Sequence, residues 1–459
     1  MNDEIYFSMI VYVDDEDLLK KSLSSIIDVT PLVKSKIKLI VADSIVSDET
    51  KAVCDNIGKE LGQKQFVYLS MKDANIGEAY NKALKYTEGR YANFSLASTY
   101  FEPNTLDIIY SIAEEIGRPK LLCLSPWTVN EKGEYVQYKM SPAMENKPYI
   151  EVSLHDTPEK LHLMFHAYFI RCYLLRSEER TMQFKPELLE EAPLEMLCNL
   201  LAEFMRYTYL SNLVFNYTKQ LEDNTSAFME QHYRWWYMDS FRNWILPFAE
   251  KWNAEKYPLR NSMRMLLLYL VFARYNCNLN DRTKGVVERS DIPEMRMLTG
   301  KILQFVDNKI IFSKTSLQHF NIPRAMKIMF MEIKAEQMNC ICEPIVSGGK
   351  IYIWTHKKYD EMTQKSLDRA KYIESATTDD IKAAGKELDM TSRMFTVSRE
   401  DNDVPVLKWT REQESLLPVC ELKKEHVILY AINYSKNCLK IDGLLSLGNF
   451  IDREKIKLY

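Results

Sequence analysis

Buried strands alternate with helical segments along the N-terminal region, and this alternation limits the fold more than any other feature of the chain. The strand segments are continuous apolar and β-branched runs at positions 5–13, 37–43, 65–70 and 91–97. Apolar residues recur at helical spacing between them, at positions 15–27, 48–61 and 78–87. Runs that are apolar on both faces are typical of a parallel sheet covered by helices. The sequence therefore predicts an α/β domain, and such sheets bind ligands beyond the carboxyl ends of their strands.

A second series of segments completes this domain. We expect helices at 105–117, 158–175 and 193–208, strands at 120–127 and 210–218, and a long loop or irregular hairpin at 128–157. The last of these strands closes the domain near residue 220.

The composition changes near residue 222, where the chain becomes rich in Trp, Tyr and Met at helical spacing. We predict four regions: an α/β domain at 1–220, a helical module at 221–340, a mixed α/β connection at 341–424, and a β-rich segment at 425–459. The last segment alternates as strands do, but it holds too few strands to bury a core. It therefore either packs against the rest of the protein or begins a domain that continues beyond residue 459.

Net charge, cysteine content and hydropathy limit the kinds of binding partner and the cellular location that we expect. The net charge is −4, which gives no electrostatic argument for binding nucleic acid. The chain has nine cysteines without a repeated spacing, and its N-terminus does not resemble a signal peptide. Both features favour reduced thiols in the cytoplasm. The most apolar segment, 262–277, has nine residues between Arg264 and Arg274, too few to span a bilayer. We expect a cytoplasmic protein without a transmembrane segment, and peripheral association at the inner face of the membrane stays open.

Four short blocks follow one another in the order and at the spacing of a known family. They are FSMIVYVDDEDLLKKSL from residue 7, VADSIVSDET from 41, NIGEAYNKAL from 75 and GRYANFSLASTYFEPNTL from 89. Together they resemble the nucleotide-binding half of a family 2 glycosyltransferase, which implies the GT-A fold, and a looser match runs to about residue 220. The helical module and the β-rich segment are similar to those of large bacterial transferases of the teichoic-acid and capsule type.

The resemblance implies a set of nucleotide-binding residues. Asp43 and Asp48 match acids that support the base or ribose, and Asn75, Gly77 and Asn81 match a turn and helix beside the diphosphate. Aspartate is also common in turns and at helix N-caps, so a turn or helix entry is the alternative for Asp43 and capping is the alternative for Asp48.

The metal-binding acids of the family are missing. Its Asp-x-Asp aligns with Leu96, Ala97 and Ser98, and Thr99 stands in place of the next acid. Mg²⁺ and Mn²⁺ prefer hard oxygen ligands, chiefly carboxylates, and these usual ligands are absent here, so binding of a divalent metal ion stays open. The resemblance implies that Ser98 contacts the nucleotide. Another group then has to balance the charge of the leaving nucleoside diphosphate. The candidates are a helix N-terminus and the side chains of Lys72, Lys82, Arg90, Tyr100 and Arg171.

An inverting transferase also needs a carboxylate base that takes a proton from the acceptor hydroxyl. The family carries it at the start of a helix, and here the matching phrase is QFKPELLEEAPLEML from residue 183. Glu191 and Glu190 are the candidates. The alternative is structural, because acids are common in the first turn of a helix.

Three further residues are candidates for contact with the sugar or acceptor. Trp127 follows a strand and could stack on a sugar ring, or it could belong to the core. The family would let Tyr168 and Arg171 face the acceptor.

The resemblance implies an inverting glycosyltransferase that moves a sugar from a nucleotide-sugar donor to a cell-surface glycan or polyol-phosphate polymer. The alternative is a catalytically inactive GT-A module that scaffolds a partner transferase or binds a glycan. A third possibility is an interaction protein whose helical module binds another chain.

Overall fold

The computed structural model describes residues 5–129, 134–138, 147–176, 182–220, 233–254, 259–278, 286–288, 290–307, 310–311, 322, 330, 333–334, 345–347, 350–356, 396–399, 405–408, 427–433 and 440–441. Contacts divide the chain into two compact units, Met1–Val287 with Leu317–Phe320, and Glu288–Ser316 with Asn321–Tyr459. The predicted region boundaries at 220, 340 and 424 stay predictions.

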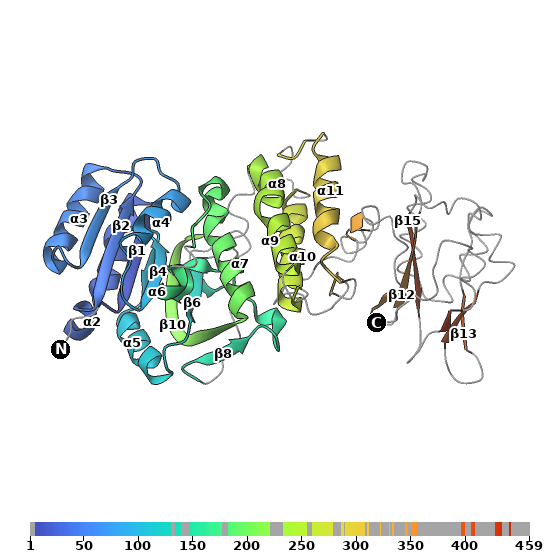
Figure 1. Cartoon of the computed structure of the whole chain (residues 1–459), viewed down its shortest axis with the longest axis horizontal. Coiled ribbons are helices and arrows are strands. Elements are labelled where there is room, and N and C mark those ends of the chain that lie inside the picture. The colour runs from blue at the N-terminus through green and yellow to red at the C-terminus, as the bar shows by residue number, and fades with distance from the viewer. Residues whose placement is uncertain are drawn as a thin grey trace. The chain divides into compact units, whose positions relative to one another are not determined.

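One sheet forms the centre of the first unit (Figure 1). Its strands are β1 (Phe7–Val13), β2 (Ile37–Asp43), β3 (Phe66–Ser70), β4 (Tyr91–Leu96), β5 (Thr99–Phe101), β6 (Leu121–Val129), β7 (Tyr135–Gln137), β8 (Ile150–Ser153), β9 (Tyr168–Arg171) and β10 (Arg206–Gln220). Eight of them, among the described residues, run in the order β3-β2-β1-β4-β9-β6-β10-β5, with β7 beside β6 and β8 beside β10. The neighbours among β1 to β4 pair in parallel, as do β6 and β10, whereas β9 is antiparallel to both of its neighbours. The predicted α/β fold is confirmed.

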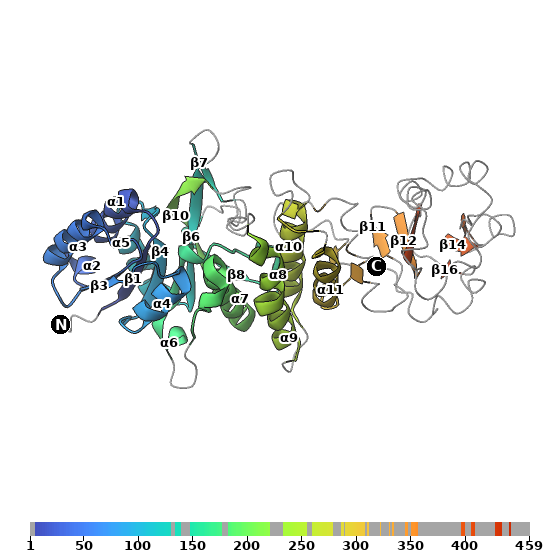
Figure 2. The same ribbon diagram turned by 90° about the horizontal axis from the view of Figure 1, so that it is seen from above.

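Helices cover both faces of this sheet. They are α1 (Glu16–Ile27), α2 (Pro31–Lys34), α3 (Asp48–Leu61), α4 (Ile76–Leu84), α5 (Thr105–Glu115), α6 (Cys172–Leu175) and α7 (Ala192–Phe204), with the 3-10 turns η1 (Pro158–Lys160), η2 (Phe165–Ala167) and η3 (Pro186–Glu191). In Figure 2, α1 and α5 lie on one side of β1 and β4, and α4 and α6 lie on the other. Every residue of β1 and β4 is buried, which explains why these strands are apolar without alternation.

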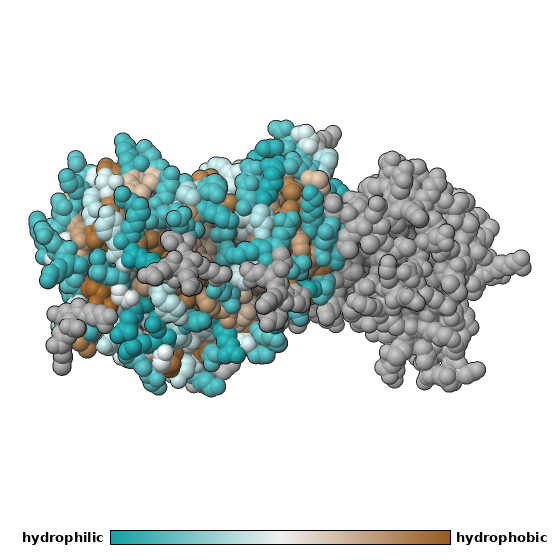
Figure 3. Space-filling view, viewed as in Figure 1, coloured by the Kyte–Doolittle hydropathy of each residue, from teal (hydrophilic) through white to brown (hydrophobic). Residues whose placement is uncertain are grey.

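The helical part of the first unit consists of α8 (Arg234–Ser240), the π-helical turn η6 (Phe241–Ile245), α9 (Leu246–Ala254) and α10 (Asn261–Asn278). Trp236 and Trp244 are fully buried, so these tryptophans fill the core of the helices. No helix of the described residues has both the length and the apolar character needed to cross a membrane. On the face shown in Figure 3, hydrophilic residues cover most of the described surface and hydrophobic ones lie in small, separate areas.

Two predicted helices of the sheet domain are wrong in part. Residues 158–175 form η1, η2, β9 and α6 instead of one helix. Tyr168, Phe169 and Ile170 are fully buried because β9 fills the space between β4 and β6, and an apolar run of this length does not distinguish a buried strand from a buried helix. The helix predicted at 193–208 ends at Phe204, because Met205 adopts the left-handed conformation (φ 54°) and β10 begins after it.

The second unit contains α11 (Ile292–Leu303) and two small sheets. The first sheet has the order β11 (Ile345–Ser347), β12 (Lys350–His356), β15 (Val427–Asn433), and the second has the order β13 (Thr396–Arg399), β14 (Pro405–Lys408), β16 (Lys440–Ile441). Strand β12 lies in the region predicted as a mixed α/β connection, and β15 and β16 lie in the segment predicted to be β-rich. The remainder of the β-rich segment, after residue 441, lies outside the described residues.

Candidate functional site

The candidate site lies where the four parallel strands β1 to β4 end, which we call the carboxyl edge. Asp14 follows β1, Asp43 ends β2, Lys72 follows β3 and the turn 96–99 follows β4. The parallel registers bring these ends to one edge of the sheet. Ligands of open α/β sheets bind at such an edge.

Asp14 holds the turn that replaces the family's metal-binding acids. Its carboxylate accepts hydrogen bonds from the backbone N–H of Ser98 at 3.0 Å and from the Ser98 hydroxyl at 2.7 Å. The carbonyl of Ser98 accepts bonds from the backbone N–H and the hydroxyl of Thr218 in β10. Ser98 is fully buried, so it stabilises the turn and does not offer its hydroxyl to a nucleotide in this conformation.

The turn does not suit a divalent metal. Leu96 and Ala97 offer no side-chain oxygen, and the Thr99 hydroxyl donates to the carbonyl of Leu96 at 2.7 Å. Asp14 alone supplies a carboxylate to the turn, and the described residues contain no cluster of three or more acidic, histidine or cysteine side chains suited to a metal. Hard cations such as Mg²⁺ need several oxygen ligands, so the residues at this turn do not fit the ion.

Each carboxylate oxygen of Asp43 accepts two hydrogen bonds from groups within the protein. One carboxylate oxygen accepts from the backbone N–H groups of Ile45 and Val46, and the other accepts from the hydroxyls of Thr50 and Tyr68, at 2.6 to 3.0 Å. Asp43 is fully buried. These contacts are those of the turn and helix-entry alternative, and they leave the carboxylate no open face for a base or ribose. Ser47 caps α3, and Asp48 is exposed in the first turn of that helix.

The predicted diphosphate-binding residues of α4 hold the segment that leads to the acidic pair. The Asn81 side chain donates to the carbonyl of Phe184 at 2.7 Å and accepts from the N–H of Phe184 at 2.8 Å. Asn75 caps α4 and donates to the carbonyl of Pro186 at 3.2 Å. A Cβ at Gly77 would lie 2.9 Å from the Cα of Pro186, so glycine is needed for this close approach. In this structure the three residues dock η3 on the sheet domain.

The two glutamates of the pair point in different directions. Glu191 is 4% exposed; it accepts from Arg274 and Trp244, each at 2.7 Å, and from Ser240. Glu190 is exposed. Glu191 is therefore placed as a buried ion-pair residue, which does not fit a base that has to reach an acceptor hydroxyl. Glu190 is the member of the pair that a substrate could reach.

The negative charges of Glu190 and Asp14 both raise the pKa of the same three tyrosines. Burial raises the pKa of Tyr80, and the negative charges of Asp14 and Glu190 raise it further. Burial likewise raises the pKa of Tyr12 and of Tyr217, and the same two carboxylates add to both shifts. Contacts place Glu190 as well: it follows Pro186 in η3, and Pro186 contacts Asn75 and Gly77 at the start of α4, next to the carboxyl edge.

Trp127 lies near the end of β6 and is half-buried, opposite Asn216 of β10 and Gln137 of β7. Its indole N–H is buried and finds no hydrogen-bond partner among the described residues. Its role in sugar stacking stays a prediction.

The structure places Tyr168 and Arg171 away from the carboxyl edge. Tyr168 is fully buried and donates to the carbonyl of His162. Arg171 pairs with Tyr91, the first residue of β4, because β9 is antiparallel to β4. The predicted contact of these two residues with the acceptor is therefore not supported, and Arg171 cannot balance charge at the carboxyl edge.

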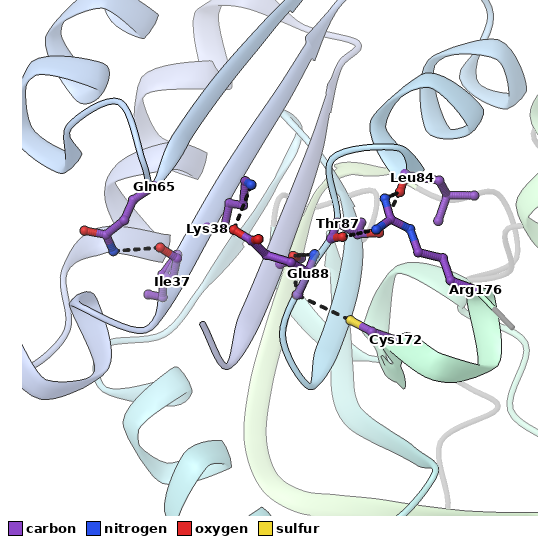
Figure 4. A network of polar contacts seen from close by, with 9 residues as sticks. Ile37, Lys38, Gln65, Leu84, Thr87, Glu88, Cys172 and Arg176 are labelled. Atoms are coloured by element: carbon purple, nitrogen blue, oxygen red, sulfur yellow. Dashed lines mark hydrogen bonds and ion pairs between the residues drawn. The ribbon is translucent and has the colours of Figure 1, made fainter. Parts of the chain in front are cut away.

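Structural contacts occupy the opposite, amino edge, where β1, β2 and β4 begin (Figure 4). Lys38 pairs with Glu88 at 2.7 Å, Gln65 donates to the carbonyl of Ile37, and Arg176 donates to the carbonyls of Leu84 and Thr87. Arg90 belongs to the same edge, since its N–H donates to the carbonyl of Tyr6. Of the cationic candidates, Lys72 follows a strand at the carboxyl edge and is exposed.

A cavity of about 510 Å³ lies between α6, α7 and α9, and none of the predicted site residues line it. Lys185 and Glu195 line it and pair with each other at 2.9 Å. We place the site at the carboxyl edge, because the exposed Glu190 lies there.

Two residues of this arrangement were missed in the sequence. Asp14 directly follows a buried strand of a parallel sheet, and that position alone could have marked it. Arg274 interrupts an apolar helix, and an arginine is almost never fully buried without a partner, so its burial predicts a buried acid. Sequence spacing could not name that acid as Glu191.

Comparisons with known proteins agree with this fold. No family model matches the chain. The chain is 21% identical to the minor teichoic acid biosynthesis protein GgaB of Bacillus subtilis over 347 residues, which cover 72% of this chain and 36% of GgaB. It is similar to the crystal structure of S. aureus TarS (TM-score 0.53, 17% identity, 76% of this chain and 58% of that chain). It is also similar to TarS 1–349 in complex with UDP-GlcNAc (TM-score 0.50, 18% identity, 76% of this chain and 96% of that chain).

The chain thus spans about a third of the length of GgaB and little more than half of the TarS chain. The resemblance predicted from the four sequence blocks is confirmed. The chain is a distant relative of GgaB and has the GT-A fold of TarS.

Proposed function

We propose that this protein is a glycosyltransferase that moves a sugar from a nucleotide-sugar donor to a cell-surface glycan or polyol-phosphate polymer. The observation that carries the proposal is the exposed Glu190, held at the carboxyl edge of a GT-A sheet on the docked turn η3. The similarity to the UDP-GlcNAc complex of TarS supports a UDP-sugar donor. The similarity to GgaB, a teichoic acid biosynthesis protein, supports a teichoic-acid acceptor. A donor of this class is met in the cytoplasm, at the inner face of the membrane where such polymers are built.

In the proposed reaction, Glu190 takes the proton from an acceptor hydroxyl. The acceptor oxygen attacks the anomeric carbon from the face opposite the diphosphate, the bond from that carbon to the diphosphate oxygen breaks, and the nucleoside diphosphate leaves. The configuration at the sugar inverts in this single displacement. General-base catalysis of this kind contributes about 10²- to 10⁴-fold to a rate.

The charge of the leaving diphosphate has to be balanced without metal ligands at the turn 96–99. The N-termini of α3 and α4 lie at the carboxyl edge, but each is capped by a side chain and carries at least one acid in its first turn. Lys72 follows β3 at the same edge, is exposed and supplies a positive charge there. We propose that Lys72 acts in place of the family's metal ion.

The alternative is an inactive GT-A module that scaffolds another transferase or binds a glycan. The saturation of Asp43 and Ser98 favours it, because two predicted nucleotide contacts are already satisfied within the protein. Calorimetry with UDP, with and without EDTA, separates the two. Binding that EDTA does not weaken supports the enzyme, whereas no heat at millimolar UDP supports the inactive module.

A further inference from the structure

The side chain of a buried arginine in the helical part binds Glu191, the residue that follows the proposed base Glu190. Arg274 of α10 is fully buried and donates to Glu191 at 2.7 Å, to the carbonyl of Trp236 at 2.8 Å and to the carbonyl of Leu270 at 3.0 Å. Its guanidinium stacks 4.5 Å from the ring centre of Trp236. Three hydrogen bonds and a stacked ring fix this planar group in one place.

The partner carboxylate is fixed equally well. The second oxygen of Glu191 accepts from the indole N–H of Trp244 and from the hydroxyl of Ser240. Turning Glu191 outward would leave a buried cation and two buried donors unpaired, which is strongly unfavourable. The backbone at Glu191 is therefore held from the side of the helical part.

The backbone directly before Glu190 is strained. Leu189 has φ 48° and ψ −125°, a conformation that residues with a Cβ rarely adopt. Such strain persists only when the surroundings hold it on both sides. Asn81 and Asn75 hold the beginning of the segment at Phe184 and Pro186, and Arg274 holds its end.

We infer that Arg274 is a positioning residue for catalysis: by holding Glu191 inward, it directs Glu190 toward the carboxyl edge. The inference rests on the proposed function, because it gives the helical part a role in the same site. It predicts that the sheet domain alone would not form a working site.

Variants of the pair separate positioning from stability. Arg274→Met leaves the buried charge of Glu191 without its cationic partner, so we expect the melting temperature to fall by roughly 10 °C. Adding Glu191→Gln removes both charges, which returns most of that loss. We expect the double variant to bind UDP as the wild type does but to turn over about 100-fold more slowly, since small misplacements of a catalytic group have effects of this size. Arg242→Met, which breaks an ion pair with Asp239 at the surface of the helical part, is the matched control.

The measurements are release of UDP from UDP-GlcNAc, affinity for UDP, and amide hydrogen exchange at residues 184–192. In the double variant we expect slow turnover and at least about tenfold faster exchange at the amides of Leu188 and Ala192, whose N–H groups bond within η3. Wild-type turnover and unchanged exchange in a stable double variant would overturn the inference. Exchange remains informative if the wild type releases no UDP, an outcome that contradicts the proposed function alone. Should the double variant not fold, Arg274→Lys, which keeps the charge without the planar fork, is expected to show the same changes more weakly.

Discussion

The carboxylate of Asp14 accepts hydrogen bonds from both the backbone N–H and the hydroxyl of Ser98, at 3.0 and 2.7 Å. An acid directly after β1 thus stabilises the turn 96–99, which aligns with the metal-binding acids of the family that the sequence resembles. The turn keeps its shape because Asp14, after β1, and Thr218, in β10, satisfy its polar groups. The absence of acids from this turn is therefore compatible with an intact carboxyl edge.

Ser98→Ala tests whether this turn is structural. The substitution removes one buried hydrogen bond, so we expect the free energy of unfolding to fall by about 1 kcal/mol. Affinity for UDP should stay unchanged, because the Ser98 hydroxyl faces Asp14. Chemical denaturation and calorimetry measure both quantities. Ser111→Ala, which removes a hydroxyl from an exposed helix position, is the control. A tenfold weaker affinity at full stability would show instead that Ser98 contacts the nucleotide.

Gly77→Ala tests the docking of η3 on α4. The new methyl group would lie 2.9 Å from the Cα of Pro186, so η3 has to move. We expect kcat to fall about tenfold or more while affinity for UDP changes little, because the displaced segment carries Glu190. Steady-state kinetics of UDP release give this result. Lys85→Ala, an exposed position at the C-terminal end of the same helix, should behave as the wild type. Equal losses in Gly77→Ala and Lys85→Ala would contradict docking at Gly77.

The buried His162 should make the folded sheet domain less stable in acid. Burial lowers the pKa of this fully buried histidine to about 3. Below pH 6.5 the unfolded chain takes up a proton that the folded protein does not, so stability is complete above that pH and is lost as the pH falls toward 3. We expect His162→Phe to reduce the slope of unfolding free energy against pH by up to about 1.4 kcal/mol per pH unit in this window.

Denaturation curves at several pH values measure that slope. The same substitution at His155, whose side chain is 65% exposed, is the control. An unchanged slope in His162→Phe would mean that the buried imidazole is protonated in the folded protein.

The sequence predicted the fold well where its signals are local. The strands β1 to β4 and the helices between them appear as apolar runs and helical periods, although the cap of α3 is Ser47 and not Asp48. The segment 158–175 was mispredicted because its burial depends on β4 and β6, which lie far away in the sequence. Periodicity carries no information about such neighbours.

The candidate site was predicted less well for the same reason. Motif positions predicted a site at the carboxyl edge with an acidic pair, but they did not predict which groups the side chains meet there. Asp43 meets Tyr68, Asn81 meets Phe184 and Glu191 meets Arg274, 83 residues further along the chain. Each of these partners turns an expected ligand contact into a contact within the protein.

Release of UDP from UDP-GlcNAc by wild type and Glu190→Gln, each with EDTA, tests the proposed enzyme most directly. Glutamine keeps the size of the side chain and removes its basicity, and Glu187→Gln, another exposed acid of η3, is the control. We predict turnover by the wild type that EDTA does not abolish, and a loss of about 100-fold or more in Glu190→Gln with unchanged affinity for UDP. Equal turnover by wild type and Glu190→Gln, or turnover that requires an added metal ion, would contradict a metal-independent transferase with Glu190 as its base.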